Sequence, residues 1–277
     1  MKKITKILIV FLFIVITIFS RETAYVASFN TLHLGWKGKN YKKTAEALVY
    51  FDLIGLQEVM NEDGMKELKK ELEKATKAKW DYFITEKNVG SGSYKEYFGY
   101  IWQKNKVTML KKYGFFPNTS EISFERPPYG ADFKIGEFDF TFVLFHNIFG
   151  NSKSERQLEA SYLNDVCIYF QDINGDEDDV ILAGDFNLPA HDNAFKSLFS
   201  NRDQIFYALD PTNKTTIGKN GLSSSYDNMF FSYKYTKEYT GECGVFDFTN
   251  NDYSIVRKTV SDHLPIFMIF YIDEDDD

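Results

Sequence analysis

The segment Val180–Pro189 reads VILAGDFNLP, in which four apolar residues run directly into Gly-Asp-Phe-Asn. This pattern predicts a buried strand that carries an aspartate and an asparagine to its carboxyl end. Because side chains alternate along a strand, Asp185 and Asn187 should face one way while Phe186 points back into the core. A carboxylate beside an amide suits the binding of water, phosphate or a hard metal ion. A strand closed by an Asx turn would have the same sequence, so the choice between a binding site and a simple strand end depends on the other strands.

Five further strand-like segments also bring a polar residue next to an apolar run. They are Ala24–Asn30, Asp52–Glu58, Asp139–His146, Ser225–Phe230 and Val260–Phe270, which carry Asn30, Gln57 and Glu58, His146, Asp227, and Asp262 with His263. A polar residue at one strand end usually just terminates the strand. Six strands with this composition instead favour one shared site assembled from the whole chain.

Helical and strand patterns alternate between these segments. Helices are predicted over Lys42–Tyr50, Glu62–Lys77, Ser154–Phe170 and Asp192–Phe199, and strands over Trp80–Lys87, Glu96–Gln103 and Val107–Tyr113. Strands outnumber helices, and several of them alternate apolar and polar residues. The pattern fits two packed sheets with helices on the outer faces, in which residues along one edge would share a cleft.

The order of the motifs resembles that of the endonuclease/exonuclease/phosphatase superfamily and, within it, the secreted DNase I-like nucleases. The matching pieces are SFN (28–30), LQEV (56–59), SYKEY (93–97), FERPP (124–128), FHN (145–147), GDFN (184–187), SYDN (225–228) and SDHLP (261–265). GDFN with a downstream SDH is the most specific combination, and SYKEY followed by NKV (105–107) points to the DNase I group. The resemblance implies an α/β four-layer sandwich of two packed, mainly antiparallel β-sheets flanked by helices.

The resemblance also implies a metal site. The glutamate of the family's QE motif is its main metal ligand, which corresponds to Glu58, and Asn30 and Asp262 are the expected neighbours. The expected ion is Mg²⁺, which prefers few carboxylates and several waters, with Mn²⁺ or Ca²⁺ as supporting ions.

Two histidine–carboxylate pairs follow from the same resemblance. His263 of SDH should pair with Asp227 of SYDN, and His146 of FHN with Glu96 of SYKEY. A carboxylate partner fixes the tautomer of an imidazole and raises its pKa, which suits proton transfer or the polarisation of a phosphate. Which histidine acts as acid and which as base stays open. The other two histidines, at positions 33 and 191, are expected to be structural, although the first lies close enough to Asn30 to need a test.

The remaining site residues are assigned to water and substrate. Asp185 would orient or deprotonate the attacking water, and Asn187 would hold a phosphate oxygen. By resemblance, Tyr94 stacks on a deoxyribose and Arg126 contacts phosphate.

The chain departs from the pancreatic-type enzymes at two positions. Those enzymes carry arginines at the minor groove where this sequence has Leu32 and Met60. The catalytic residues are unaffected, but single-stranded DNA, RNA or weaker duplex binding becomes more credible.

The first twenty residues have the plan of a signal peptide. MKKITK is basic, and Ile7–Phe19 is an apolar run too short for a comfortable membrane span. The cleaved segment could extend to residue 24, and retention as an uncleaved anchor stays open. We expect a secreted or periplasmic monomer with one catalytic domain over residues 24–271 and an acidic tail over 272–277. No stable membrane association is expected after cleavage.

Charge and cysteine content limit the partners. The formal net charge of −8 becomes −11 when the three lysines of residues 1–20 are removed, which argues against tight DNA packaging or sequence reading. A bound divalent ion can still supply positive charge at a nuclease site. Cys167 falls in a helical apolar pattern, so a bridge to Cys243 is the less favoured alternative, and neither cysteine has a neighbouring ligand spaced for zinc.

Three functions are compatible with these patterns. The first is a divalent-metal-dependent endonuclease that hydrolyses DNA with little sequence specificity. The second is a secreted sphingomyelinase, or another phosphodiesterase or phosphatase of the superfamily; a sphingomyelinase should expose an aromatic hairpin, at which only Tyr113–Pro117 hints. The third is a non-catalytic interaction protein, which should have lost at least one catalytic residue, and none is missing.

Overall fold

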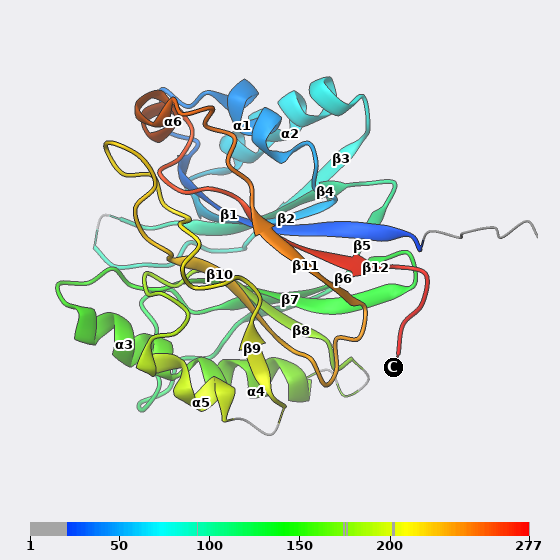
Figure 1. The fold of residues 1–277 in the computed structure, drawn as a ribbon, viewed down its shortest axis with the longest axis vertical. Coiled ribbons are helices and arrows are strands. Elements are labelled where there is room, and N and C mark those ends of the chain that lie inside the picture. The colour runs from blue at the N-terminus through cyan, green and yellow to red at the C-terminus, as the bar shows by residue number, and fades with distance from the viewer. Residues whose placement is uncertain (1–20, 93, 174, 176, 201–202, 277) are drawn as a thin grey trace, which may run out of the picture.

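Two six-stranded sheets pack face to face in the computed structural model, which describes residues 21–276 except 93, 174, 176, 201 and 202 (Figure 1). The first sheet has the order β11 (Tyr239–Val245), β12 (Ile266–Tyr271), β1 (Thr23–Leu34), β2 (Leu53–Val59), β4 (Tyr97–Gln103), β3 (Trp80–Ile84). The second has the order β5 (Val107–Phe115), β6 (Tyr129–Ile135), β7 (Phe138–His146), β8 (Val180–Asp185), β10 (Asp227–Ser232), β9 (Ile205–Tyr207). Only β1–β2 and β7–β8 pair in parallel among these strands.

Helices cover the outer face of each sheet (Figure 1). The first sheet carries α1 (Tyr41–Leu48), α2 (Glu62–Thr76) and α6 (Tyr253–Thr259), and the second carries α3 (Lys153–Ser161), α4 (Leu163–Ile173), the short η1 (Asn193–Phe195) and α5 (Lys196–Phe199). This arrangement confirms the predicted four-layer sandwich. Among the helices of the described part of the chain, none combines the length and apolar character needed to cross a membrane.

The prediction of one continuous helix is wrong, because the structure has two helices there. The sequence indicated a single helix over Ser154–Phe170, whereas the structure divides it at Tyr162 into α3 and α4. The amide of Tyr162 bonds to the Glu159 carbonyl at 3.2 Å, three residues earlier rather than four. The Ser161 hydroxyl also donates to the Leu158 carbonyl at 2.6 Å, which competes with the helical backbone bonds.

Aromatic side chains fill the space between the sheets. The largest fully buried ones there include Tyr100, Tyr129, Phe133, Phe140 and Phe142. The Tyr100 hydroxyl, on the first sheet, lies 2.9 Å from each of two carbonyl oxygens of the second sheet, those of Tyr129 and Phe142. The aromatic content of the sequence therefore serves the inter-sheet core, and one buried hydroxyl joins the two layers.

The two cysteines are free thiols. Cys167 is buried in α4, and burial raises its pKa to about 12. Cys243 donates its thiol to the Ala208 carbonyl at 3.0 Å. The disfavoured disulfide is not present between these two described residues.

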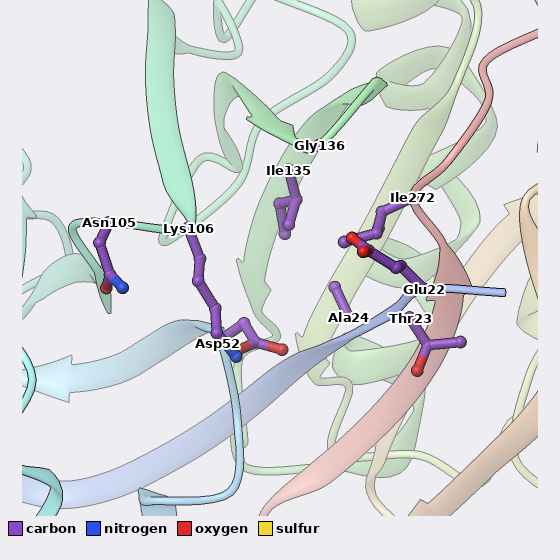
Figure 2. Close-up of a pocket in the computed structure, with 9 residues that line it drawn as sticks. All are labelled: Glu22, Thr23, Ala24, Asp52, Asn105, Lys106, Ile135, Gly136 and Ile272. Carbon is purple, nitrogen blue, oxygen red and sulfur yellow. The ribbon is translucent and has the colours of Figure 1, made fainter. Parts of the chain in front are cut away.

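The amino end of β1 and the carboxyl end of β12 meet at one end of the sandwich. The Ile272 amide donates to the Glu22 carbonyl, and Arg21 forms ion pairs with Asp273 and Glu274. A cavity of about 430 Å³ opens beside them (Figure 2). The signal-peptide prediction concerns residues 1–20, which lie outside the described residues.

Candidate active site

The polar strand ends predicted from the sequence converge at the opposite end of the sandwich. A cavity of about 380 Å³ is lined there by predicted site residues from four segments of the chain: Glu58, His146, Asp185, Asn187, Asp262 and His263. Strand pairing explains the convergence. His146 lies opposite Asp185 in the parallel β7–β8 pair, and Asp227 lies opposite Asp185 in the antiparallel β8–β10 pair. Phe186 is buried in the core, as the alternation predicted.

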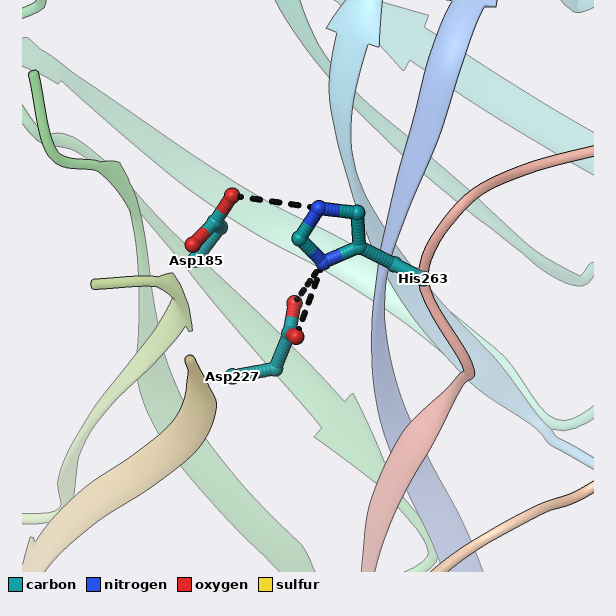
Figure 3. A group of neighbouring side chains, drawn as sticks. All are labelled: Asp185, Asp227 and His263. Carbon is teal, nitrogen blue, oxygen red and sulfur yellow. Dashed lines mark hydrogen bonds and ion pairs between the residues drawn. The ribbon is translucent and has the colours of Figure 1, made fainter. Parts of the chain in front are cut away.

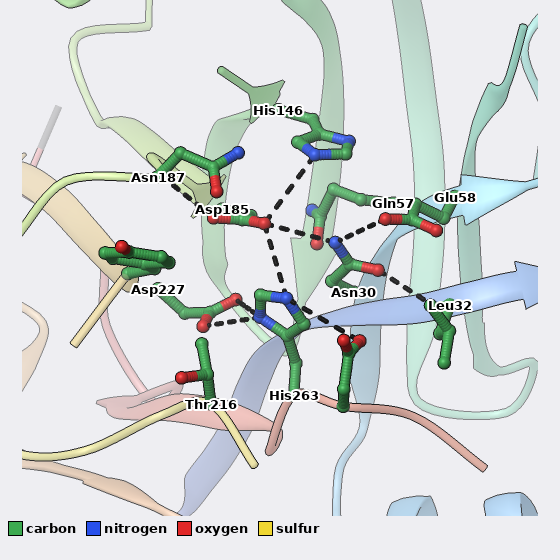
Figure 4. A network of polar contacts seen from close by, with 12 residues as sticks. Asn30, Leu32, Gln57, Glu58, His146, Asp185, Asn187, Thr216, Asp227 and His263 are labelled. Atoms are coloured by element: carbon green, nitrogen blue, oxygen red, sulfur yellow. Dashed lines mark hydrogen bonds and ion pairs between the residues drawn. The ribbon is translucent and has the colours of Figure 1, made fainter. Parts of the chain in front are cut away.

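Asp185 is the centre of the polar network (Figure 4). Its Oδ2 atom lies 3.6 Å from His146 Nε2 and 3.5 Å from His263 Nε2, and accepts a hydrogen bond from Asn30 Nδ2 at 3.2 Å. Its Oδ1 atom accepts the backbone amide of Asn187 at 2.9 Å. One carboxylate is thus shared by residues from four separate segments of the chain.

The first histidine–carboxylate pair is His263 with Asp227 (Figure 3). His263 Nδ1 lies 2.8 Å and 3.1 Å from the two carboxylate oxygens of Asp227. The Thr215 hydroxyl also donates to Asp227 Oδ2 at 2.6 Å and fixes that carboxylate. Burial alone would lower the pKa of His263, but the charges of Asp227 and Asp185 raise it well above its ordinary value. His263 is therefore an imidazolium at neutral pH.

The second pair is His146 with Glu96. His146 Nδ1 lies 2.7 Å from Glu96 Oε1, and both side chains are buried. Burial and, to a smaller extent, the neighbouring charge of Arg126 lower the pKa of His146 to about 4. Burial also raises the pKa of Glu96 to about 7, against the effect of Arg126. His146 is therefore neutral at neutral pH, unlike His263.

Arg126 is buried behind the second pair. Its Nε atom donates to the His146 carbonyl at 3.1 Å, and a terminal nitrogen donates to the Asn147 carbonyl at 2.9 Å. Its Nε atom also lies 3.9 Å from Glu96 Oε2. In this arrangement Arg126 supports the β7 strand end, and its predicted contact with phosphate stays a prediction.

Glu58 offers the best fit for the predicted metal. Its Oε1 atom accepts a hydrogen bond from Asn30 Nδ2 at 3.1 Å, whereas its Oε2 atom is buried and makes no hydrogen bond with any described residue. A buried carboxylate oxygen without a donor is costly unless a cation approaches it. Glu58 also has a φ of 57°, a left-handed conformation that costs energy for a residue other than glycine. Asp262 lines the same cavity and lies 3.4 Å from Arg257.

A second group of possible ligand atoms lies in the same site. One atom each of Asp185, Asp227 and His263 lies within 4.8 Å of the others. However, the imidazole Nδ1 is already hydrogen-bonded to the Asp227 carboxylate. This trio is therefore better suited to proton transfer, while the carboxylate of Glu58, which lines the cavity, suits a metal.

An aromatic row borders Glu58, and the sequence did not reveal it. The ring of His33 stacks on Trp36 with centroids 4.0 Å apart and meets Tyr94 edge-on at 5.4 Å. His33 Nε2 lies 3.4 Å from Glu58 Oε2, so His33 is part of the site rather than remote from it. Trp36 is half exposed, at 51%. The only signal in the sequence was the short distance of His33 from Asn30.

Lys39 is a further residue that the sequence did not single out. Its ammonium group donates to the carbonyls of Thr31 and Val260, both at 2.6 Å, and so holds the end of β1 against the segment before Asp262. Burial lowers the pKa of Lys39 to about 8, against the charges of Glu58 and Asp262. Lys39 positions the segments that supply Asn30 and Asp262, two of the three predicted metal ligands.

A two-sheet α/β sandwich with paired histidines and carboxylates at one edge is the architecture of a hydrolase of phosphate esters. Residues 27–263 match the profile described as the Endonuclease/Exonuclease/phosphatase family, and the chain belongs to this family. The resemblance inferred from the motifs is confirmed, and the chain is a hydrolase of that superfamily, whose enzymes depend on divalent metals.

Curated relatives share about a quarter of their residues with this chain. A deoxyribonuclease of Thioalkalivibrio sp. (strain K90mix) is 28% identical over 261 residues, which cover 88% of this chain and 70% of the relative. Deoxyribonuclease-1-like 1 of Rattus norvegicus is 27% identical over 229 residues, which cover 80% of this chain and 71% of the relative.

Solved structures show the same fold at lower identity. A humanized TDP2 of D. rerio has a TM-score of 0.62 at 17% identity, with 90% of this chain and 98% of that chain covered. A mannosyl-6-phosphatase of Bacteroides thetaiotaomicron has a TM-score of 0.61 at 18% identity, with 88% and 98% covered.

Proposed function

We propose that the chain is an exported, divalent-metal-dependent endonuclease that hydrolyses phosphodiester bonds of DNA with little sequence specificity. The observation that carries this proposal is the convergence of His146 and His263, one neutral and one charged, on Asp185. Two relatives whose names denote deoxyribonucleases support the choice of substrate. Export rests on the sequence of residues 1–20 alone.

The chemistry divides between the two histidine pairs. A phosphodiester in the cavity would lie against Asp185, His146 and His263, which all line it. Asp185 and neutral His146 would orient the attacking water and take its proton as the new P–O bond forms. Protonated His263 would donate its proton to the leaving oxygen as the old P–O bond breaks. Asp227 keeps His263 charged and oriented.

Metal ligands and phosphate contacts complete the proposed site. Glu58 would hold the divalent ion with Asn30 and Asp262 nearby, and Mg²⁺ there would neutralise charge on the phosphate. Asn187 would face a phosphate oxygen; its Nδ2 atom donates to the Asn147 carbonyl at 2.9 Å, which fixes the amide plane.

The surroundings of the site favour single strands among DNA substrates. Trp36 presents an exposed ring beside Glu58, and unpaired bases stack on such rings without regard to sequence. Leu32 lines the cavity where an arginine would reach a minor groove. The proposed substrate range therefore includes single-stranded DNA, with RNA as a further possibility to be tested.

The segment that hinted at a sphingomyelinase gives that alternative no support. The segment Tyr113–Pro117 does not project from the surface as an aromatic finger. Tyr113 and Phe115 are half-buried in β5, and Phe116 is buried against Phe124. A phosphodiesterase or phosphatase with another substrate remains the second candidate, because the same catalytic residues could hydrolyse phosphate esters of different alcohols.

The test is nicking of supercoiled plasmid by purified residues 21–277 in the presence of Mg²⁺. Relaxed and linear products should appear, and should disappear with EDTA or in His146→Ala. His191→Ala is the matched control, because His191 is exposed and outside the cavity lining. Intact plasmid from a folded protein that still splits a simple phosphodiester would reject duplex DNA as the substrate and retain the chemistry.

A further inference from the structure

Four carboxylates meet at the end of β8 that lies opposite the active site. Asp179 directly precedes β8, Glu238 directly precedes β11, and Asp275 and Asp276 follow β12. One carboxylate oxygen of each lies within 4.8 Å of those of the others. Because β8 belongs to the second sheet and β11 and β12 to the first, the cluster joins the two sheets.

Two of these carboxylates are buried with an oxygen that has no partner. Asp179 is 1% exposed and Glu238 is 2% exposed. Asp179 Oδ1 and Glu238 Oε2 make no hydrogen bond with any residue that the structure describes, and neither does the buried Thr236 Oγ1. The hydroxyl of Thr236 lies close enough to lower the pKa of Asp179. Buried acceptors of this kind need either protons or a cation.

The residues that the structure describes supply no positive charge to these two carboxylates. The charges that act on Asp179 and Glu238 come from other carboxylates, and in the described part of the chain neither residue has an ion pair with lysine or arginine. Lys134 lies near Asp275, but its ammonium pairs with Asp139 at 2.7 Å.

Four neighbouring carboxylates repel one another when they carry charge, and this repulsion opposes folding. A divalent cation would remove both the repulsion and the missing contacts.

We propose that a hard divalent cation, with Ca²⁺ preferred, binds to Asp179, Glu238, Asp275 and Asp276. The bound cation would connect the two sheets at a distance from the active site. The four ligands are all carboxylate oxygens, and the Thr236 hydroxyl beside Asp179 would offer a neutral one. Ca²⁺ accepts six to eight oxygens in irregular geometry, whereas Mg²⁺ requires a near-ideal octahedron and gives up its waters reluctantly. The site is separate from the proposed nuclease chemistry, because it lies at the other end of β8.

Thermal unfolding tests this site. The purified protein is first dialysed against EDTA, and its melting temperature is then measured as Ca²⁺ is added to about 10 mM. The melting temperature should rise by about 3–6 °C. The rise should persist in Glu58→Gln, which alters the proposed catalytic metal site, and in Asp63→Asn, which removes the same charge from an exposed helix position. It should be lost in Asp179→Asn and Glu238→Gln.

A second signature separates cation binding from a merely structural role. In EDTA, Asp179→Asn and Glu238→Gln should unfold at the wild-type temperature or above it, because each relieves repulsion between carboxylates. Equal destabilisation of these variants with and without Ca²⁺ would overturn the proposal, as would a full Ca²⁺ response in either. Equilibrium dialysis of folded Glu58→Gln with radioactive Ca²⁺ is independent of the folding of those variants, and no bound Ca²⁺ would also reject the site.

Discussion

His146 and His263 approach the same carboxylate oxygen, Asp185 Oδ2, at 3.6 Å and 3.5 Å (Figure 4). Their pKa values move in opposite directions, because burial and Arg126 act on His146, whereas two carboxylates outweigh burial at His263. Pairs of titratable groups whose environments separate their pKa values commonly divide the roles of base and acid. The relationship supports His146 as the base and His263 as the acid in the proposed reaction.

Replacing Asp227 by asparagine tests this assignment. The change removes the charge that keeps His263 protonated, so the basic limb of kcat/KM against pH should move to lower pH. The rate at neutral pH should fall by about 10²–10⁴-fold, the usual contribution of a positioned acid. The measurement is the pH profile of plasmid nicking, with His191→Ala as the control. An unmoved basic limb would show that the group titrating there is not His263.

Glu96→Gln should reveal the charge state of His146 in the stability of the protein. The pKa of His146 falls from 6.5 to about 4 on folding, so the unfolded chain binds the proton first as the pH drops. Stability from this group is complete above pH 6.5 and is lost as the pH falls towards 4, by about 3 kcal/mol. In the wild type the raised pKa of Glu96, about 7, opposes this loss.

The measurement is urea unfolding of the wild type and Glu96→Gln between pH 7 and pH 4. The variant should lose stability more steeply than the wild type over that interval. Parallel curves for the two proteins would mean that the buried pair does not hold the protons as described.

The strand ends could be predicted from the sequence because their environment is local. Asp185, His146 and Asp227 each end or begin a strand, and strand pairing then places them opposite one another. The break at Tyr162 could not be foreseen, because a serine hydroxyl competes there with an otherwise regular helical pattern.

Other features depend on distant parts of the chain. Trp36 meets Tyr94 through His33 only because a loop after β1 folds against the loop before β4. The pKa of His146 depends on Arg126, which lies twenty residues away in sequence. Neither relationship leaves a periodic trace in the sequence.

Trp36→Ala should weaken binding of single-stranded DNA. The exposed indole stacks on His33 beside Glu58, and loss of one stacking platform costs about 1–3 kcal/mol per base. KM for a single-stranded oligonucleotide should rise by about 5–100-fold. The rate with a small phosphodiester that has no base should stay the same.

A matched loss of activity on both substrates would indicate damage to the site instead of a lost contact. Tyr50→Ala, an exposed aromatic that follows α1 and is outside the cavity lining, is the control.

Gly184→Ala should destabilise the strand that delivers Asp185. Gly184 has a φ of +152°, and a Cβ atom there would overlap the Phe145 carbonyl oxygen of the neighbouring strand β7. Backbone atoms cannot move aside as a flexible side chain can, so strands β7 and β8 would have to separate where they hold His146 and Asp185 in register. The free energy of unfolding should fall by about 3 kcal/mol or more.

Urea unfolding measures this loss. The control is Gly175→Ala, where a Cβ meets nothing within 4 Å, and its free energy of unfolding should stay within about 0.5 kcal/mol of the wild type. Wild-type stability in Gly184→Ala would mean that β8 tolerates a wider spacing from β7 than its register implies.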